Sequence, residues 1–440
     1  MQANALEHLR GPMERALELG KANGASAMRI TAHQGESQSI GFQAGRLKNA
    51  DGSDGMGYSI HVVKDGRSGA ASGNMPDMLE NMVERALALT QFGAVSHFTE
   101  YPAPAASYAA PQLYSSSVKA LSQEKQLADC QELVDFLKSK EDGLDIEAGA
   151  KVHESQSLLM TSGGFVGETH SGGWSISAGF QRTAGTDMLF SGAWRGGIRL
   201  DDLYDLDYLK RELAFDLEYG SRTATLADGA YPVYIPPDWL GSFLRPVSMG
   251  ISGRSVFKGT SPLGDQLGKA CSASNLTITD DPHTDFRGES SGYDGAGVPT
   301  VRRNLVENGV LQHFLYDWDT AHMAGKAPTG HDGCAPHTML VKPGDTDSKT
   351  MLRSIDKGIY IRQLLGFGQG NLANGDFSCN IALGYVIEKG EVVGRLKNAM
   401  AAGNILELLK GDIRFSSDVD PQTRQPYAIL SGVNIVSRNA

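Results

Sequence analysis

The sequence predicts an α+β fold, in which helix-plus-sheet N-terminal units are followed by a β-rich, mainly antiparallel C-terminal domain. Helical apolar periodicity is confined to a few segments, and most of these precede residue 230. Short alternating runs fill much of the remaining chain, with Gly-containing turns between them. The 53 glycines are dispersed among these runs, which is typical of turns and bulges in β structure.

The first predicted domain, residues 1–115, begins with a helix over residues 5–22 and has a second helix over residues 76–91. Four short strands are expected between these helices, at residues 27–32, 37–43, 58–63 and 68–72. Asp65-Gly66 is a strong hairpin signal between the last two strands. Residues 101–117 are rich in Pro, Ala and Ser, and we interpret them as a linker or a wrapping segment.

The second predicted domain, residues 116–228, has a helix over residues 122–140, a β-meander over 144–197 and a helix within 201–226. The third predicted domain, residues 229–440, consists mostly of strands and turns. Its expected hairpin tips are at residues 307–309 and 388–390. Helices are expected in it at residues 236–250, 317–324 and 347–360.

The predicted helix at residues 236–250 places five apolar side chains on one face: Trp239, Leu240, Phe243, Leu244 and Val247. Asp238 is expected to be its N-cap. Pro246 removes a backbone donor and clashes one turn back, at a cost of about 3 kcal/mol inside a regular helix, so the helix should kink or end near Arg245. After Asp238 the segment contains no His, Cys, Asp or Glu.

Composition and net charge argue against some classes of binding partner and indicate a cellular compartment. The formal charge of −11 and the pI near 5.5 argue against nucleic-acid or anionic-membrane surfaces, because such partners need clustered Lys and Arg. No run reaches 18 apolar residues, and the first twenty residues lack the apolar core of a signal peptide. The four cysteines are scattered singly, as is typical of reduced thiols. We therefore expect a cytoplasmic protein.

The residues also suggest one metal site, formed by His331, Cys334 and His337 within a seven-residue segment. The alternative, a polar surface loop between strands, is favoured because no second paired motif exists and Pro336 restricts how the loop can wrap. The acids at positions 280, 281, 285, 289 and 294 lack the spacing of a calcium loop, so we interpret them as solvated turn residues. No G-x-S-x-G elbow and no P-loop occurs.

Several short sequence segments are more informative about the protein family than the residue types are. Residues 366–404, GFGQGNLANGDFSCNIALGYVIEKGEVVGRLKNAMAAGN, closely resemble the C-terminal signature of the TldD/PmbA family, in particular its PmbA (TldE) branch. Supporting strings occur in the same order at residues 279–281, 293–300, 306–310 and 328–330, and the 57–73 hairpin region is similar to the first domain of the family. The resemblance covers nearly the whole chain.

This resemblance implies a function. Family members work as cytoplasmic TldD/TldE heterodimers that degrade unfolded peptides and trim the leaders of modified peptides. The TldD type holds zinc with an HExxxH helix and a cysteine near the C-terminus; the His pair binds the metal and the Glu can act as general base.

In this chain, Trp239-x-Gly241 matches the start of the metal-bearing helix. Arg245 then stands at the first His, Pro246 at the Glu, and Met249 or Gly250 at the second His, while no Cys occurs after Cys379. The resemblance therefore implies no catalytic, cofactor-binding or metal residue on this chain. Zinc is expected on the TldD-type partner.

Two alternatives stay open at this point. One is a stand-alone peptide-binding module that forms a homodimer in isolation, and the other is a metal hydrolase that uses His331, Cys334 and His337. The family also has an older association with gyrase modulation, but an acidic chain without basic patches gives direct DNA contact little support.

Overall fold

The structure is a computed structural model that describes residues 6–201 and 203–437, and it confirms the predicted α+β class. The α-helices are α1 (Glu7–Ala22), α2 (Leu79–Leu89), α3 (Gln123–Lys140), α4 (Leu206–Gly220), α5 (Pro237–Phe243), α6 (Arg245–Gly250), α7 (Gly253–Phe257), α8 (Trp318–Ala324), α9 (Ser348–Arg353) and α10 (Ile405–Leu408). Among these described residues, no helix is long and apolar enough to cross a membrane.

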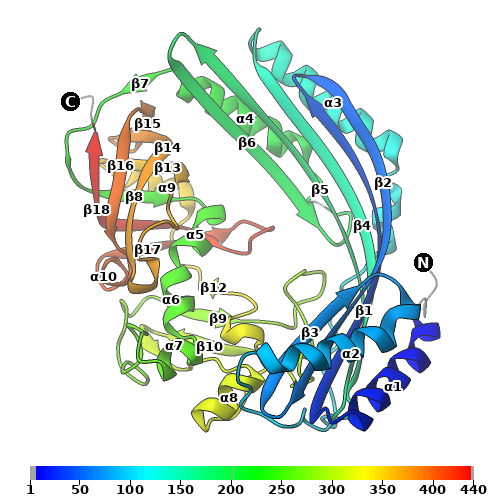
Figure 1. The fold of residues 1–440 in the computed structure, drawn as a ribbon. Coiled ribbons are helices and arrows are strands. Elements are labelled where there is room, and N and C mark those ends of the chain that lie inside the picture. Colours follow the sequence, from blue (N-terminus) through cyan, green and yellow to red (C-terminus); the bar gives the residue numbers. More distant parts are fainter. Residues whose placement is uncertain (1–5, 202, 438–440) are drawn as a thin grey trace.

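The first sheet is fully antiparallel, with the strand order β3-β2-β1-β4-β5-β6. Its strands are β1 (Ala27–Gln43), β2 (Arg46–Lys64), β3 (Arg67–Gly73), β4 (Asp145–Thr161), β5 (Val166–Ala184) and β6 (Asp187–Gly197). Several of these strands are long and curved, and they arch from the N-terminal helices to the region beside the C-terminal sheet (Figure 1). β6 is the last strand of this sheet, so no strand of the described residues pairs with its outer edge.

The helices cover the two ends of the same face of this sheet. Near one end, α1 and α2 pack on Met28, Ile30 and Ile60. Near the other end, α3 and α4 pack on side chains such as Phe42 and Ile176. The opposite, concave face carries small and polar side chains, because glycines and serines occupy alternate positions of β4 and β5 there.

One expectation for the first sheet needs revision. The short strands predicted at 27–32 and 37–43 are parts of one strand, β1, because the pairing with β2 and β4 continues through the half-exposed middle where no helix covers the sheet. The predicted boundary at residue 115 separates strands of the same sheet, since β1 pairs with β4 along 14 consecutive residues. The division into domains at residues 115 and 228 stays a prediction.

The C-terminal region contains two further sheets. A small sheet has the order β11-β10-β9-β12, and the larger one has the order β13-β8-β18-β16-β14-β15-β7, with β17 paired to β18. An additional pairing of β13 with β14 closes five of these strands into a ring, and only β13–β8 and β15–β7 are parallel. The strands are β7 (Thr223–Ala224), β8 (Gly229–Ile235), β9 (Ile278–Asp280), β10 (Arg303–Glu307), β11 (Val310–Leu311), β12 (Leu340–Val341), β13 (Lys357–Leu365), β14 (Asp376–Glu388), β15 (Glu391–Leu396), β16 (Ala399–Asn404), β17 (Ile413–Val419) and β18 (Pro426–Ser437).

The helix predicted over residues 347–360 is shorter than expected. It ends at Arg353, and the rest of that segment enters β13. The residues from Gly358 to Ile361 are buried on both faces between β8 and β14, so they form a continuous apolar run. Such a run cannot be distinguished from a buried helix by periodicity alone.

Residues 101–117 wrap around the C-terminal region. The backbone N–H of Phe286 donates to the carbonyl of Gln112 (2.6 Å), and the N–H of Gln112 donates to Asp285 (2.8 Å). Gly292 approaches the same segment so closely that a Cβ added there would lie 1.9 Å from the carbonyl oxygen of Ala109. These contacts tie the segment to residues that are distant in sequence.

Candidate functional site

Helices α5 and α6 form the broken helix that the sequence predicts at residues 236–250. α5 ends at Phe243 and α6 begins at Arg245, so Pro246 lies in the first turn of a new helix, where its missing N–H costs little. Phe243 and Val247 are buried in the C-terminal core. Asp238 is not the N-cap as expected: the cap position is Pro236, and Asp238 lies in the first turn, where a carboxylate favours the positive end of the helix dipole.

This helix does not fit a zinc ion. Arg245 and Met249 are exposed on its outer side, and Pro246 and Gly250 are buried. A guanidinium offers only N–H donors and proline offers no side-chain ligand. The thiol of Cys379 is also unsuitable, because burial in β14 raises its pKa to about 11, and only the thiolate is a good ligand.

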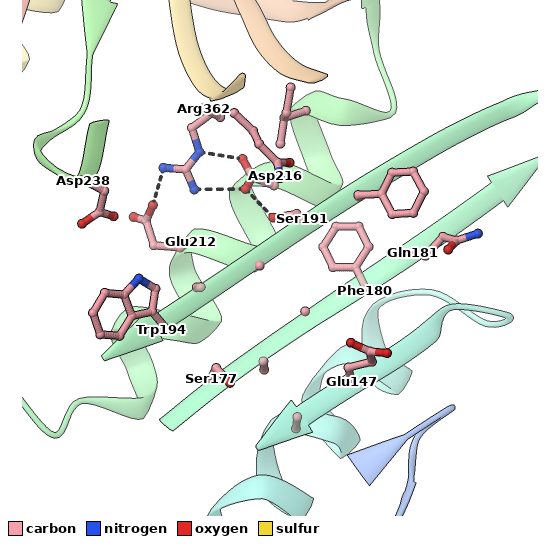
Figure 2. A pocket seen from close by; sticks show the side chains of 18 of the residues that line it. Glu147, Ser177, Phe180, Gln181, Ser191, Trp194, Glu212, Asp216, Asp238 and Arg362 are labelled. Carbon is pink, nitrogen blue, oxygen red and sulfur yellow. Dashed lines mark hydrogen bonds and ion pairs between the residues drawn. The ribbon is translucent and has the colours of Figure 1, made fainter. Parts of the chain in front are cut away.

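A cleft of about 840 Å³ lies beside α5, between the first sheet and the C-terminal region (Figure 2). It is lined by parts of β4, β5 and β6, by α4, by the start of α5 and by β13. Trp239 links α5 to this wall, since its indole N–H donates to the carbonyl of Arg362 at 2.8 Å. The broken helix and the cleft are therefore structurally connected.

A buried ion cluster holds one wall of the cleft (Figure 2). Arg362 contacts Glu212 at 2.8 Å and makes two hydrogen bonds to Asp216, at 3.0 and 3.1 Å. The hydroxyls of Tyr385 and Ser191 also donate to Asp216, at 2.8 and 2.5 Å. Burial opposes the charge of Arg362, but Tyr360 and these carboxylates hold its pKa above the ordinary value. The cluster joins β6, α4 and β13.

Three further carboxylates give the cleft an acidic character. Asp145, Glu147 and Asp238 line it, and within the described part of the chain none of them has an ion-pair partner within 4.0 Å. Asp238 is exposed to the cleft, and desolvation by the surrounding walls together with the nearby Asp420 raises its pKa. The cleft is therefore suited to a ligand that carries positive charge.

The outer edge of β6 opens into the same cleft. Residues 190–194 line it consecutively, and the side chains of Phe190 and Trp194 are half exposed. At the two ends of the strand, Arg395 donates to the carbonyl of Met188, and the N–H of Gly196 donates to Gln422. Backbone groups alternate in direction along an antiparallel strand, so those of residues 190, 192 and 194 also point outward. An extended peptide could pair with them.

The predicted metal ligands are only partly brought together. His331 and His337 converge, but the third group of the cluster is Asp280 and not Cys334. Cys334 is buried and its sulfur accepts from the N–H of Asp317 at 3.3 Å. The expectation of a polar surface loop holds for Asp332, Gly333 and Ala335, which are exposed, and is wrong for His331 and Cys334, which are buried. The expectation of solvated turn acids is wrong for Asp280 and Asp294, because both side chains are buried.

The other acids of the 280–294 stretch do not converge with Asp280. Asp281 pairs with Arg302 at 3.2 Å, and Asp285 binds the wrapping segment. Asp294 is buried, and its Oδ1 accepts from the N–H groups of Ala296 and Val298, both at 2.9 Å. Each of these acids therefore has a local structural role.

Sequence reasoning missed the cleft. Arg362 meets Glu212 and Asp216 only through the tertiary structure, since about 150 positions separate β13 from α4. No motif signals the pairing. The only available signal was the presence of acidic residues on the buried side of the predicted helix 201–226.

The chain is similar to proteins of one family along most of its length. The model of the PmbA/TldA metallopeptidase C-terminal domain matches residues 228–437, and the model of PmbA/TldA metallopeptidase domain 1 matches residues 30–90. Together the two matches span more than half of the chain. A metalloprotease PmbA homolog of Haemophilus influenzae is 25% identical over 98% of this chain and 97% of that protein.

A metalloprotease of Methanothermobacter thermautotrophicus is 26% identical, over 88% of this chain and 87% of that protein. The crystal structure of TldE from Thermococcus kodakarensis superposes with a TM-score of 0.84 and 20% identity, over 97% of this chain and 100% of that one. A crystal structure from Bacteroides thetaiotaomicron, described as a candidate modulator of DNA gyrase, gives a TM-score of 0.89 with 20% identity, over 99% of this chain and 100% of that one. At this identity the structural likeness shows the fold alone.

Proposed function

Because the chain belongs to the PmbA/TldD family of metallopeptidases, we propose that it is the non-catalytic, PmbA/TldE-type subunit of a heterodimeric zinc metalloprotease. Its partner is a TldD-type chain that carries the zinc ion. The substrates are unfolded or modified peptides, and the complex works in the cytoplasm.

One observation carries this proposal. The helix that corresponds to the metal-bearing helix of the TldD type presents Arg245, Pro246 and Gly250 in place of its ligands and base. A zinc peptidase needs neutral imidazoles or carboxylates as ligands and an open position for water. Without them this chain contributes walls and binding groups, and the partner contributes the chemistry.

The cleft supports a role in peptide binding. An extended peptide that lies along residues 190–194 of β6 adds a strand to the first sheet, and main-chain hydrogen bonds then provide affinity with little dependence on sequence. The half-exposed rings of Phe190 and Trp194 give apolar contacts. The carboxylates of Asp145, Glu147 and Asp238 favour basic side chains or a free amino terminus.

Reconstitution with a TldD-type partner tests this proposal. Cleavage of a fluorogenic unfolded peptide is followed for the partner alone, for this chain alone and for the mixture. We expect no cleavage by this chain alone and a large gain in the mixture, with both chains in one peak of a size-exclusion column. Absence of a gain over the partner alone would contradict the proposal.

A stand-alone peptide-binding homodimer is the second candidate, because the open edge of β6 needs no partner chain to accept a peptide. It predicts saturable peptide binding by a homodimer and no effect of the TldD-type chain. A fluorescence-anisotropy titration of the isolated chain, with its mass measured by light scattering, distinguishes the two candidates.

A further inference from the structure

A buried side-chain cluster in the small sheet lies outside the site described above. Asp280 is the last residue of β9, and His331 and His337 come from the segment that leads to β12. The Nε2 atom of His331 lies 2.7 Å from Oδ2 of Asp280, and Nδ1 of His337 lies 3.4 Å from the same oxygen. Asp280 and His331 are fully buried, and the side chain of His337 is 14% exposed.

In two of these groups, the polar atom that faces away from the cluster has a hydrogen-bond partner. Oδ1 of Asp280 accepts from the backbone N–H of Thr338 at 2.7 Å, and Nδ1 of His331 lies 2.9 Å from the hydroxyl of Thr329. Metal-binding imidazoles and carboxylates are typically oriented by such outer partners, which leave one atom of each group directed at the metal. Asp280 and His331 have this arrangement.

In the part of the chain that the structure describes, no Lys or Arg lies within 4.0 Å of the Asp280 carboxylate. Arg303 is its register partner on β10, but the guanidinium donates to the backbone carbonyls of Thr329 and Val301, at 2.9 and 3.4 Å. Within the described residues, only the two imidazoles lie within 4.0 Å of the Asp280 oxygens as ionisable partners. A buried charge of this kind needs a proton or a metal ion between the carboxylate and the imidazoles.

The hydroxyl of Thr329 is compatible with either a proton or a metal ion between Asp280 and His331. It accepts from the N–H of Tyr316 at 2.8 Å, and it can donate either to Nδ1 of His331 or to the carbonyl of Tyr316, at 3.1 Å. When it donates to Tyr316, Nδ1 of His331 carries the proton. Nε2 then presents a lone pair to the carboxylate, and this arrangement requires a cation in between.

We propose that Asp280, His331 and His337 bind a divalent transition-metal ion, with zinc as the first candidate. Two imidazoles and one carboxylate are a ligand set that zinc accepts, and ligand atoms of a tetrahedral zinc lie about 3.3 Å apart. The His337–Asp280 distance of 3.4 Å already fits this value. The His331 imidazole must move back by about 0.6 Å, which is the opening that replacement of a shared proton by a metal requires.

This ion would have a structural role and would be distinct from the zinc of the TldD-type partner. It would tie β9 to the segment between residues 331 and 337, which the sequence otherwise leaves as a loop. The side chain of His337 is 14% exposed, so the ion and a water molecule as its fourth ligand would enter from this side. The proposal does not depend on the proposed function, because either can fail alone.

Metal uptake by the full chain, purified without a histidine tag, tests the proposal. The protein is stripped with EDTA and titrated with Zn²⁺, and Co²⁺ is used in parallel because its visible absorption reports imidazole and carboxylate ligands. We expect stoichiometric uptake, a Co²⁺ absorption band and a raised melting temperature. Failure of the wild-type chain to take up either ion stoichiometrically would overturn the proposal and would leave a hydrogen-bonded network without metal.

Variants identify the site. His337→Ala removes the least buried ligand, and we expect it to weaken Zn²⁺ binding by more than about 100-fold, since even the loss of an outer partner costs 10- to 100-fold. His313→Ala is the control, because His313 is an exposed histidine outside the cluster. Equal affinity of His337→Ala and wild type would overturn the proposal.

A measurement on the unmodified chain covers the case in which His337→Ala does not fold. Modification of His337 by diethyl pyrocarbonate is quantified by mass spectrometry with and without Zn²⁺. We expect the metal to protect His337 and to leave His313 reactive. Equal modification of His337 in both conditions would also overturn the proposal.

Discussion

Replacement of Gly192 by proline tests whether a peptide pairs with the open edge of β6. Gly192 is exposed, it is in the middle of the segment that lines the cleft, and its N–H points outward by the alternation along the strand. Proline removes this donor and leaves the pairing with β5 intact, because proline is tolerated on the free side of an edge strand. The substitution therefore removes a hydrogen bond to the bound peptide and leaves the pairing of β6 with β5 intact.

The magnitude follows from one hydrogen bond. A typical hydrogen bond contributes about 1 kcal/mol net, and this is about a fivefold change in Kd. An unpaired carbonyl left on a bound peptide would add to this loss, up to about 3 kcal/mol in total. We therefore expect Gly192→Pro to weaken peptide binding between about five- and 150-fold.

Gly192→Ala is the matched control. A Cβ at this position would meet only the carbonyl oxygen of Ala178, at 3.7 Å, which is an ordinary contact. Alanine keeps the N–H, so we expect its affinity to equal that of the wild type. Fluorescence anisotropy with a labelled unfolded peptide measures both variants, alone and with the TldD-type partner, and circular dichroism checks the fold. Equal affinity of the proline and alanine variants would refute the reasoning.

Three further predictions concern stability, and chemical denaturation measures each of them. Arg362→Met leaves the buried carboxylate of Asp216 and the half-buried carboxylate of Glu212 without their cation and should cost about 3–5 kcal/mol; a loss below about 1 kcal/mol, as for an exposed pair, would contradict this. Burial raises the pKa of Asp294 to about 6, so the stability that this group contributes is fully present below about pH 4 and is lost as pH rises through 6, with an amplitude of about 3 kcal/mol. Asp294→Asn should flatten this pH dependence of the free energy of unfolding. An unchanged pH profile would contradict the prediction. Gly292→Ala should lower the free energy of unfolding by about 1–3 kcal/mol or more, because its Cβ would lie 1.9 Å from the carbonyl oxygen of Ala109. In the control Gly288→Ala the added Cβ meets no atom within 4 Å, so this change should be neutral.

Local signals predicted the elements that depend on neighbouring residues. The broken helix at 236–250 follows from the apolar spacing around Phe243 and from the missing N–H of Pro246, and both act within one or two turns. The Asp65-Gly66 turn is found between β2 and β3 for the same reason, since both residues adopt positive φ there. The length of β1 was missed because strand pairing with β2 and β4, and not its own alternation, sustains its middle.

For the candidate site as well, the sequence predicted only what depends on the side chains themselves and on neighbouring residues. The sequence by itself determined that residues 239–250 offer no His, Cys, Asp or Glu side chain, because ligand chemistry is a property of the side chains present. It also placed His331 and His337 near each other along the chain. Only the tertiary structure decided that Asp280 joins them, that Cys334 does not, and that Arg362 closes one wall of an acidic cleft. The reason is physical: burial and charge pairing depend on which segments meet in space, and strands paired at long range bring together residues that no local pattern relates.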